Sequence, residues 1–253
     1  MAILVTRPHP DAATTAAALR AKGFDVLLAP MLRFEPVAFQ IDTDARFEAL
    51  IVSSANALRA ISESPVRAVL LEVPLFAVGE RTAQVARDNG FVNVTAAGGD
   101  AVSLRELIVA QARAKRLKKS GELLYLAAVD RARDLGTELG DLGFNISTVK
   151  VYRMAPVPEL PSDVSSACAN GQVEAVLHYS GRSARAFLDA ARAAAVEISA
   201  LALPQCCFSE AVAAIVREGG ATQVAVARAP DEDAMFEVLE RVLHARSGVR
   251  PKT

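Results

Sequence analysis

The sequence carries two copies of one pattern. Residues 2–37 align with residues 122–157 without a gap, at a constant offset of 120 positions. Eight aligned pairs are identical, whereas ordinary amino-acid usage gives about two or three. The identical pairs are Leu4/Leu124, Ala12/Ala132, Leu19/Leu139, Gly23/Gly143, Phe24/Phe144, Arg33/Arg153, Pro36/Pro156 and Val37/Val157. A chain that repeats in this way predicts two similar domains with a cleft between them.

Two further blocks extend the repeat through the chain. Residues 47–62 align with residues 173–188 at an offset of 126, and residues 74–95 align with residues 204–225 at an offset of 130. The offset changes only between blocks, as expected where loops absorb insertions. The pairs shared by these blocks include Ser54/Ser180, Arg59/Arg185, Glu80/Glu210, Arg87/Arg217 and Gly90/Gly220.

Each copy reads as alternating strands and helices. Short apolar runs are followed by Ala- and Leu-rich segments with helical spacing, and Gly23, Gly90 and Gly143 stand where such helices would end. The apolar runs are residues 3–6, 26–29, 50–52, 75–78, 123–126, 175–179 and 205–208. Continuous apolar strands that alternate with helices favour parallel sheets covered on both faces. The predicted fold class is α/β, with two similar doubly wound parallel-sheet domains.

Proline-rich segments near residues 36 and 156–161 resemble linkers. The periodicity permits two domain arrangements. In one, contiguous halves meet near residue 120. In the other, the chain leaves the first domain near residue 36 and returns to it near residue 155.

Composition narrows the class of protein. The hydrophobic content of 52% and net charge of −1 indicate a folded chain and give no reason to expect nucleic acid or an anionic membrane as a partner. Three cysteines without metal-type spacing fit a reducing compartment. The N-terminal residues lack the pattern of a signal peptide, and no apolar stretch is long enough to span a bilayer. We therefore expect a cytoplasmic protein.

The loops that follow the predicted strands are rich in hydroxyl groups and arginine. In parallel sheets, ligands bind at the carboxyl ends of the strands, where helix N-termini present free N–H groups. Such loops suit the binding of carboxylates. Alternatively, their serines and asparagine act only as helix caps. These loops contain Arg7, Ser54, Asn56, Gly79, Thr82, Arg131, Ser180, Arg182 and Ser183.

Other chemistries find little support in the sequence. The chain has no G-x-G-x-x-G motif after its first strand, no P-loop and no G-x-S-x-G motif. His9, His178 and His244 are scattered singly, so no metal site is indicated. We therefore expect no dinucleotide site, no P-loop site and no metal site.

Several segments together resemble the uroporphyrinogen-III synthase family. They are ILVTRP near the start, ALIVSSANALRAI, FAVGERTA, the segment from YLAAVDRARDLG to STVKVYR, and HYSGRSARAF. The resemblance covers essentially the whole chain, in this order and spacing. It implies two α/β domains joined by a two-stranded connection. One domain would comprise residues 1–34 and 158–253 and the other residues 39–150, with linkers at residues 35–38 and 151–157.

The resemblance also implies an activity. The family is a cofactor-free lyase that cyclises the linear tetrapyrrole hydroxymethylbilane. The substrate loses its hydroxyl as water, and ring D is inverted on closure to give uroporphyrinogen III. The only partner expected is this polycarboxylate substrate, and a monomer is sufficient because one chain carries both domains.

Carried over position by position, the family's linker tyrosine falls on Tyr152 and its loop threonine on Thr82. Tyr152 would donate a proton or hydrogen bond to the departing hydroxyl, unless it only packs locally. Thr82 would bind substrate, unless it serves only the first turn of its helix. Ser54, Asn56, Ser180 and Ser183 match positions that face the cleft in the family.

One residue departs from the family pattern. Val212 stands where the second copy usually has a threonine, and valine donates no hydrogen bond. A homologue that kept the fold and lost turnover is therefore one alternative. Another is a two-domain protein that closes on an anion, as a carrier or sensor, without catalysis.

Overall fold

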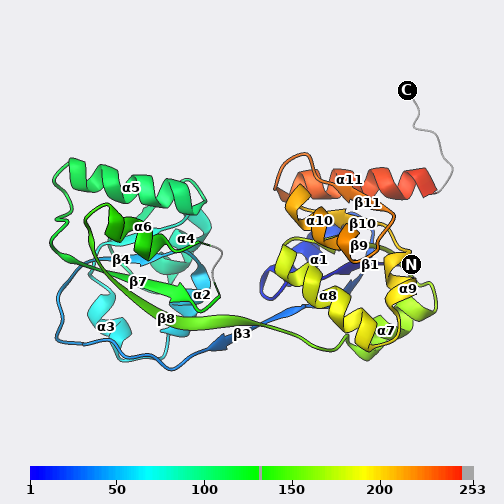
Figure 1. Cartoon of the computed structure of the whole chain (residues 1–253), viewed down its shortest axis with the longest axis horizontal. Helices are drawn as coiled ribbons and strands as arrows, with labels where there is room; N and C mark the ends of the chain where they lie inside the picture. The colour runs from blue at the N-terminus through cyan, green and yellow to red at the C-terminus, as the bar shows by residue number, and fades with distance from the viewer. Residues whose placement is uncertain (131–132, 247–253) are drawn as a thin grey trace. The chain divides into compact units, whose positions relative to one another are not determined.

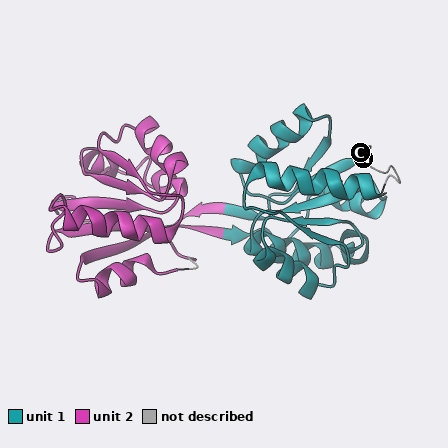
Figure 2. Ribbon diagram, turned by 90° about the horizontal axis from the view of Figure 1, so that it is seen from above, with its two compact units in different colours: residues 1–33, 155–253 teal, residues 34–154 magenta. Residues whose placement is uncertain are grey.

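The computed structural model describes residues 1–130 and 133–246. The chain divides into two compact units (Figure 2). Unit 1 combines Met1–Arg33 with Ala155–Thr253, and unit 2 is Phe34–Met154. Unit 2 is therefore one continuous segment inserted into unit 1.

Unit 1 is built on a five-stranded sheet with the strand order β11-β10-β9-β1-β2, and all its neighbouring strands are parallel. Its strands are β1 (Ala2–Val5), β2 (Asp25–Leu28), β9 (Val173–His178), β10 (Gln205–Cys207) and β11 (Val224–Val226). Its helices are α1 (Asp11–Ala21), α7 (Ser162–Ala169), α8 (Gly181–Ala193), α9 (Glu197–Leu201), α10 (Glu210–Glu218) and α11 (Glu232–Arg246) (Figure 1).

Unit 2 contains a six-stranded sheet with the order β3-β8-β7-β4-β5-β6, which is parallel from β8 to β6. The strands of this sheet are β3 (Leu32–Pro36), β4 (Phe47–Val52), β5 (Leu75–Ala77), β6 (Val94–Ala96), β7 (Glu122–Ala128) and β8 (Asn145–Pro156). Strand β3 begins in unit 1 and β8 ends there. The helices of unit 2 are α2 (Ala55–Ala60), α3 (Val66–Leu70), α4 (Glu80–Asp88), α5 (Ala101–Arg113) and α6 (Leu135–Asp141).

The two sheets confirm the duplication read from the sequence. The order β6-β5-β4-β7-β8 of unit 2 corresponds strand by strand to β11-β10-β9-β1-β2 of unit 1. Strands β4 and β9 begin and end at the offset of 126, and β5 and β10 do so at the offset of 130. The predicted fold class, two similar parallel-sheet α/β domains, is therefore confirmed.

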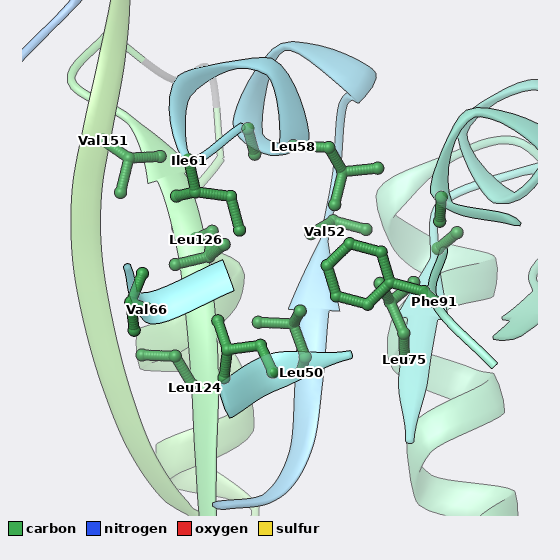
Figure 3. Close-up of a cluster of buried hydrophobic side chains, with 14 of the residues drawn as sticks. Leu50, Val52, Leu58, Ile61, Val66, Leu75, Phe91, Leu124, Leu126 and Val151 are labelled. Atoms are coloured by element: carbon green, nitrogen blue, oxygen red, sulfur yellow. The ribbon is translucent and has the colours of Figure 1, made fainter. Parts of the chain in front are cut away.

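Successive side chains of each strand are buried on opposite faces of the sheet. In unit 2, Leu50 and Val52 pack beneath α2 (Figure 3), whereas Ala49 and Ile51 pack against α5 and α6. Unit 1 behaves likewise, because the adjacent Cys206 and Cys207 belong to different clusters on the two faces. Burial on both faces explains why the strands read as continuous apolar runs.

The chain passes between the units in β3 and β8. These strands are neighbours in the unit 2 sheet, and the N–H of Val37 donates to the carbonyl of Val151 at 3.0 Å. Beyond their ends, the N–H of Val157 donates to the carbonyl of Met31 at 3.0 Å. The units are thus joined by two strands, as the resemblance implied, and the strands end one or two residues before the predicted linkers do (Figure 2).

Candidate functional site

The predicted site residues gather at the carboxyl edge of each sheet. In unit 2, Ser54 and Asn56 follow β4, Gly79 and Thr82 follow β5, and Tyr152 pairs with the last residue of β7. In unit 1, Arg7 follows β1. Ser180 follows β9 and caps α8, and Arg182 and Ser183 lie in the first turn of that helix. Arg131 lies outside the described residues.

Ser54 caps the N-terminus of α2 by bonding to Asn56. The hydroxyl oxygen of Ser54 accepts a hydrogen bond from the N–H of Asn56 at 3.2 Å. The Asn56 amide donates to the sulfur of Met154 in β8 at 3.5 Å. Sulfur is a weak acceptor, so this amide remains able to exchange its partner for a stronger oxygen acceptor.

The helix after β5 begins at a glycine. Gly79 is the N-cap of α4 and contributes no side-chain bond. A Cβ at this position would lie 3.0 Å from the Cα of Gly99, so a side chain would crowd the neighbouring loop. The helix therefore leaves its first N–H groups without a side-chain acceptor from the cap.

Thr82 lies in the first turn of α4 and is only 7% exposed. Its hydroxyl has no hydrogen-bond partner within the part of the chain that the structure describes. Capping does not explain this residue, because α4 receives no side-chain cap. Among the described residues, only Nε of Arg67 is buried without a partner, so the unpaired hydroxyl of Thr82 reaches solvent and is able to bond to a ligand.

Tyr152 is packed into the core of unit 2. It is 6% exposed, and the centroid of its ring lies 5.9 Å from that of Phe34, with the two rings stacked. The guanidinium of Arg59 lies 4.5 Å from the centroid of the Phe34 ring. The carbonyl of Tyr152 accepts from the N–H of Val129 at 2.8 Å. The ring is held between elements that lie far apart in the sequence, which is why sequence analysis did not identify Phe34.

Ser180 and Ser183 form a capping pair at the start of α8. The hydroxyl of Ser180 accepts from the N–H of Ser183 at 3.1 Å and donates to the Ser183 hydroxyl at 2.9 Å. Ser183 is fully buried, whereas Ser180 is half-buried. Ser180 is therefore the more accessible of the two hydroxyls.

Arg7 is already engaged inside unit 1. It forms ion pairs with Asp11 at 3.0 Å and Glu232 at 3.1 Å, and it lies 4.5 Å above the ring of Tyr179. The Tyr179 hydroxyl donates to Glu232 at 3.3 Å. Burial, with the charge of Glu232 second, raises the pKa of Tyr179 above its usual range. The charge of Arg7 is thus compensated by two carboxylates, which sequence analysis did not foresee.

A cavity of about 440 Å³ opens beside the start of α8 in unit 1. It is lined by both polar and apolar residues, namely Leu32, Pro156, Ser180, Gly181, Arg182, Arg185, Ala186, Asp189 and Ile215. Apolar walls with a few convergent polar groups are typical of small-molecule sites. Two of the predicted site residues, Ser180 and Arg182, therefore belong to a cavity.

The described residues contain neither a group suited to a metal ion nor a helix suited to cross a membrane. Within residues 1–130 and 133–246, no three His, Cys, Asp or Glu side chains form a group able to hold a metal ion. Over the same residues, none of the helices combines the length and the apolar character needed to cross a bilayer.

Two copies of one parallel-sheet unit, each with hydroxyl groups and arginines along its carboxyl edge, define a duplicated α/β protein suited to binding an anionic ligand. The family model for uroporphyrinogen-III synthase HemD matches residues 13–237. The chain therefore belongs to the uroporphyrinogen-III synthase family.

Solved structures agree with this family at the level of the fold. The uroporphyrinogen-III synthetase of Helicobacter pylori superposes with a TM-score of 0.66 at 20% identity, covering 95% of this chain and 99% of the other. A mutant uroporphyrinogen-III synthase of Thermus thermophilus gives a TM-score of 0.56 at 16% identity, covering 97% and 100%. No curated protein sequence matches the chain.

Proposed function

We propose that this protein cyclises hydroxymethylbilane to uroporphyrinogen III, with loss of the terminal hydroxyl as water and inversion of ring D. The observation that carries the proposal is the family match over residues 13–237. The carboxyl-edge loops of both units support it, because they offer N–H, hydroxyl and guanidinium groups to a polycarboxylate.

The chemistry requires more positioning than activation. A flexible chain of pyrroles must be held so that its two ends meet, which removes an entropic part of the barrier. The protein must also bind the transition state of the inverted closure more tightly than that of the simple closure, which occurs without the enzyme. Many weak anion-binding groups suit this task better than one nucleophile.

Tyr152 is the proposed proton donor to the departing hydroxyl. Its position at the carboxyl edge of the unit 2 sheet and the stacking of Phe34 on its ring support this role, because a fixed ring holds its hydroxyl in one place. Loss of the hydroxyl as water leaves an azafulvene cation, which cyclises through a spiro intermediate that inverts ring D and then loses a proton.

The remaining groups bind the substrate in this proposal. The hydroxyl of Thr82 and the amide of Asn56 are the best-supported donors, because internal hydrogen bonds engage them least. Ser180 and Arg182 line the cavity of unit 1. The other members of the proposed binding set are Arg7, Ser54, Gly79, Arg131 and Ser183. One chain supplies all of these residues, so we propose a monomer that needs no cofactor and acts in the cytoplasm.

An isomer assay tests the proposal. Freshly prepared hydroxymethylbilane is mixed with the protein, and the products are oxidised and separated as the type I and type III porphyrins. We expect type III in excess, whereas buffer alone gives type I. A protein that binds the tetrapyrrole but leaves only type I would instead be a binding protein or a homologue without turnover, for which Val212 is the sequence signal.

A further inference from the structure

Three pairs of arginines are identical in the two copies of the repeat, and two of these pairs have partners within the chain. Arg87 and Arg217 each form an ion pair with a glutamate in the first turn of their own helix. Arg33 and Arg153 also interact with other residues of the chain. Contacts within the fold therefore account for both of these pairs.

The third pair, Arg59 and Arg185, has no such partner. Both side chains are exposed. Neither forms an ion pair with a carboxylate anywhere in residues 1–130 or 133–246, not even with Glu63 or Asp189 one turn further along the chain. Internal ion pairing does not explain why both copies carry an arginine at this position.

Both arginines stand near the proposed substrate groups of their own unit. Each lies in the helix that follows the central strand, five positions after the capping serine Ser54 or Ser180. Arg59 stacks on Phe34, which itself stacks on Tyr152. A guanidinium held over an aromatic ring has five N–H donors, and the ring does not neutralise its charge, so it can still bind a carboxylate.

Arg185 lines the cavity of about 440 Å³ beside α8, together with Ser180 and Arg182. Leu32 and Ile215 supply apolar wall in the same cavity. A pyrrole ring placed against this wall would bring its carboxylate substituents toward the two guanidinium groups.

We propose that Arg59 and Arg185 each bind a carboxylate of the tetrapyrrole substrate, one in each unit. The proposal rests on the proposed function, and it adds two residues to the binding set. It also gives a reason for the pairwise retention of these arginines, because a substrate with similar carboxylates along its length presents the same chemistry to both copies.

Charge-removing variants test the proposal. Arg59→Gln and Arg185→Gln should each raise KM for hydroxymethylbilane roughly tenfold, the usual loss for one charged hydrogen bond, with a smaller change in kcat. KM should also depend less on salt in each variant, because one screened attraction is gone. Arg59→Lys and Arg185→Lys should recover part of the loss, and all four variants should keep the melting temperature of the wild type.

The repeat supplies matched controls. Arg87→Gln and Arg217→Gln remove arginines that are also retained in both copies but are paired internally, and KM should stay unchanged. Asp189→Asn removes a carboxylate from the cavity and with it a repulsion of substrate carboxylates, so KM should fall.

The outcomes separate this proposal from the proposed function. If the wild type makes the type III isomer and KM is unchanged in both Gln variants, the arginine assignment is wrong and the function stands. If only one variant responds, the assignment fails for the other arginine.

If the wild type makes no type III isomer, fluorescence titration with uroporphyrin III replaces the kinetic test. Weaker binding in Arg59→Gln and Arg185→Gln, but not in Arg87→Gln, then supports the assignment, whereas equal binding or no binding by any form overturns it.

Discussion

Tyr152 can be tested apart from the packing of its ring. Tyr152→Phe keeps the stacking on Phe34 and removes only the hydroxyl. We expect formation of the type III isomer to slow roughly 100-fold, the usual scale for a positioned acid, with little change in melting temperature. An unaltered rate would remove Tyr152 from the mechanism.

Tyr125 provides the comparison. Its hydroxyl lies 3.0 Å from that of Ser53, and the residue as a whole is 2% exposed. Tyr125→Phe should therefore cost stability of about 1 kcal/mol through a lost buried hydrogen bond, and it should leave the isomer ratio unchanged.

A similar variant distinguishes substrate binding by Thr82 from a structural role of its hydroxyl in the helix. Thr82→Val replaces the hydroxyl by a methyl group of similar size, as Val212 already does at the equivalent position in α10. Because the hydroxyl has no internal partner among the described residues, the melting temperature should hold or rise slightly while the rate falls. A loss of stability at constant rate would show that Thr82 supports the helix. The reciprocal variant Val212→Thr tests whether the missing hydroxyl limits turnover.

His178 predicts a pH dependence of stability. It is fully buried between the side chains of Thr6 and Gln205. The amide nitrogen of Gln205 donates to two backbone carbonyls, so the imidazole Nε2 of His178 donates to the side-chain oxygen of Gln205. Burial lowers the pKa of His178 to about 4, despite the opposing hydrogen bond to Gln205.

The unfolded chain, with an ordinary histidine pKa of 6.5, binds more protons than the folded protein between pH 6.5 and pH 4. Stability is therefore complete above pH 6.5 and decreases as pH falls toward 4, by on the order of 3 kcal/mol from this group. Denaturant titrations across this range should show a shallower loss in His178→Gln than in the wild type. His244→Gln, at an exposed histidine, should keep the full loss, and equal slopes in all three proteins would contradict the assignment.

At the level of single residues, the sequence predicted where site residues lie along the strands and helices better than it predicted which residues contact them. It placed Ser54, Thr82 and Ser180 beyond strand ends, where they lie. It did not predict that Glu232, from a helix near the other end of the chain, would pair with Arg7. Strand ends follow from local pattern, whereas such a contact depends on which strands become neighbours.

The elements themselves offer a test of the repeat. Gly23 and Gly143, an identical pair, follow the helices α1 and α6 with φ of +88° and +83°. Alanine at Gly143 should cost roughly 1–2 kcal/mol, because an L side chain is strained in this conformation. Gly140, three positions earlier and inside α6, also has open space around its Cα. Gly140→Ala should stabilise by up to about 1 kcal/mol. Equal effects in thermal unfolding would contradict this account.

Sequence pattern predicted most strands but missed the edge strands β6 and β11, and it was the family resemblance that implied a two-stranded connection between the domains. Strands β6 and β11 lie at sheet edges and are not fully buried, whereas β5 and β10, which also have three residues each, are fully buried and were predicted. Strand β8 extends over 12 residues, and its proline end suggested a linker. Its pairing with β3 depends on a strand far away in the sequence.

At the level of the whole molecule, unit 2 should fold by itself. It is one continuous segment, and helices cover both faces of its sheet with two apolar clusters. A protein of residues 34–154 should therefore unfold cooperatively with α/β circular dichroism. A featureless spectrum for this fragment would show that unit 2 depends on the rest of the chain. The sequence left the division of the chain open between two arrangements, because the repeat alone fits both.

The insertion of one unit into the other sets an order of events on the ribosome. Strand β1 is made first, yet it lies in the interior of its sheet between β2 and β9, and β9 begins only at Val173. Unit 2 is synthesised entirely before that residue. During synthesis, β1 can therefore pair with β2 but not with β9 until unit 2 has left the ribosome. Unit 1 begins first and is completed last.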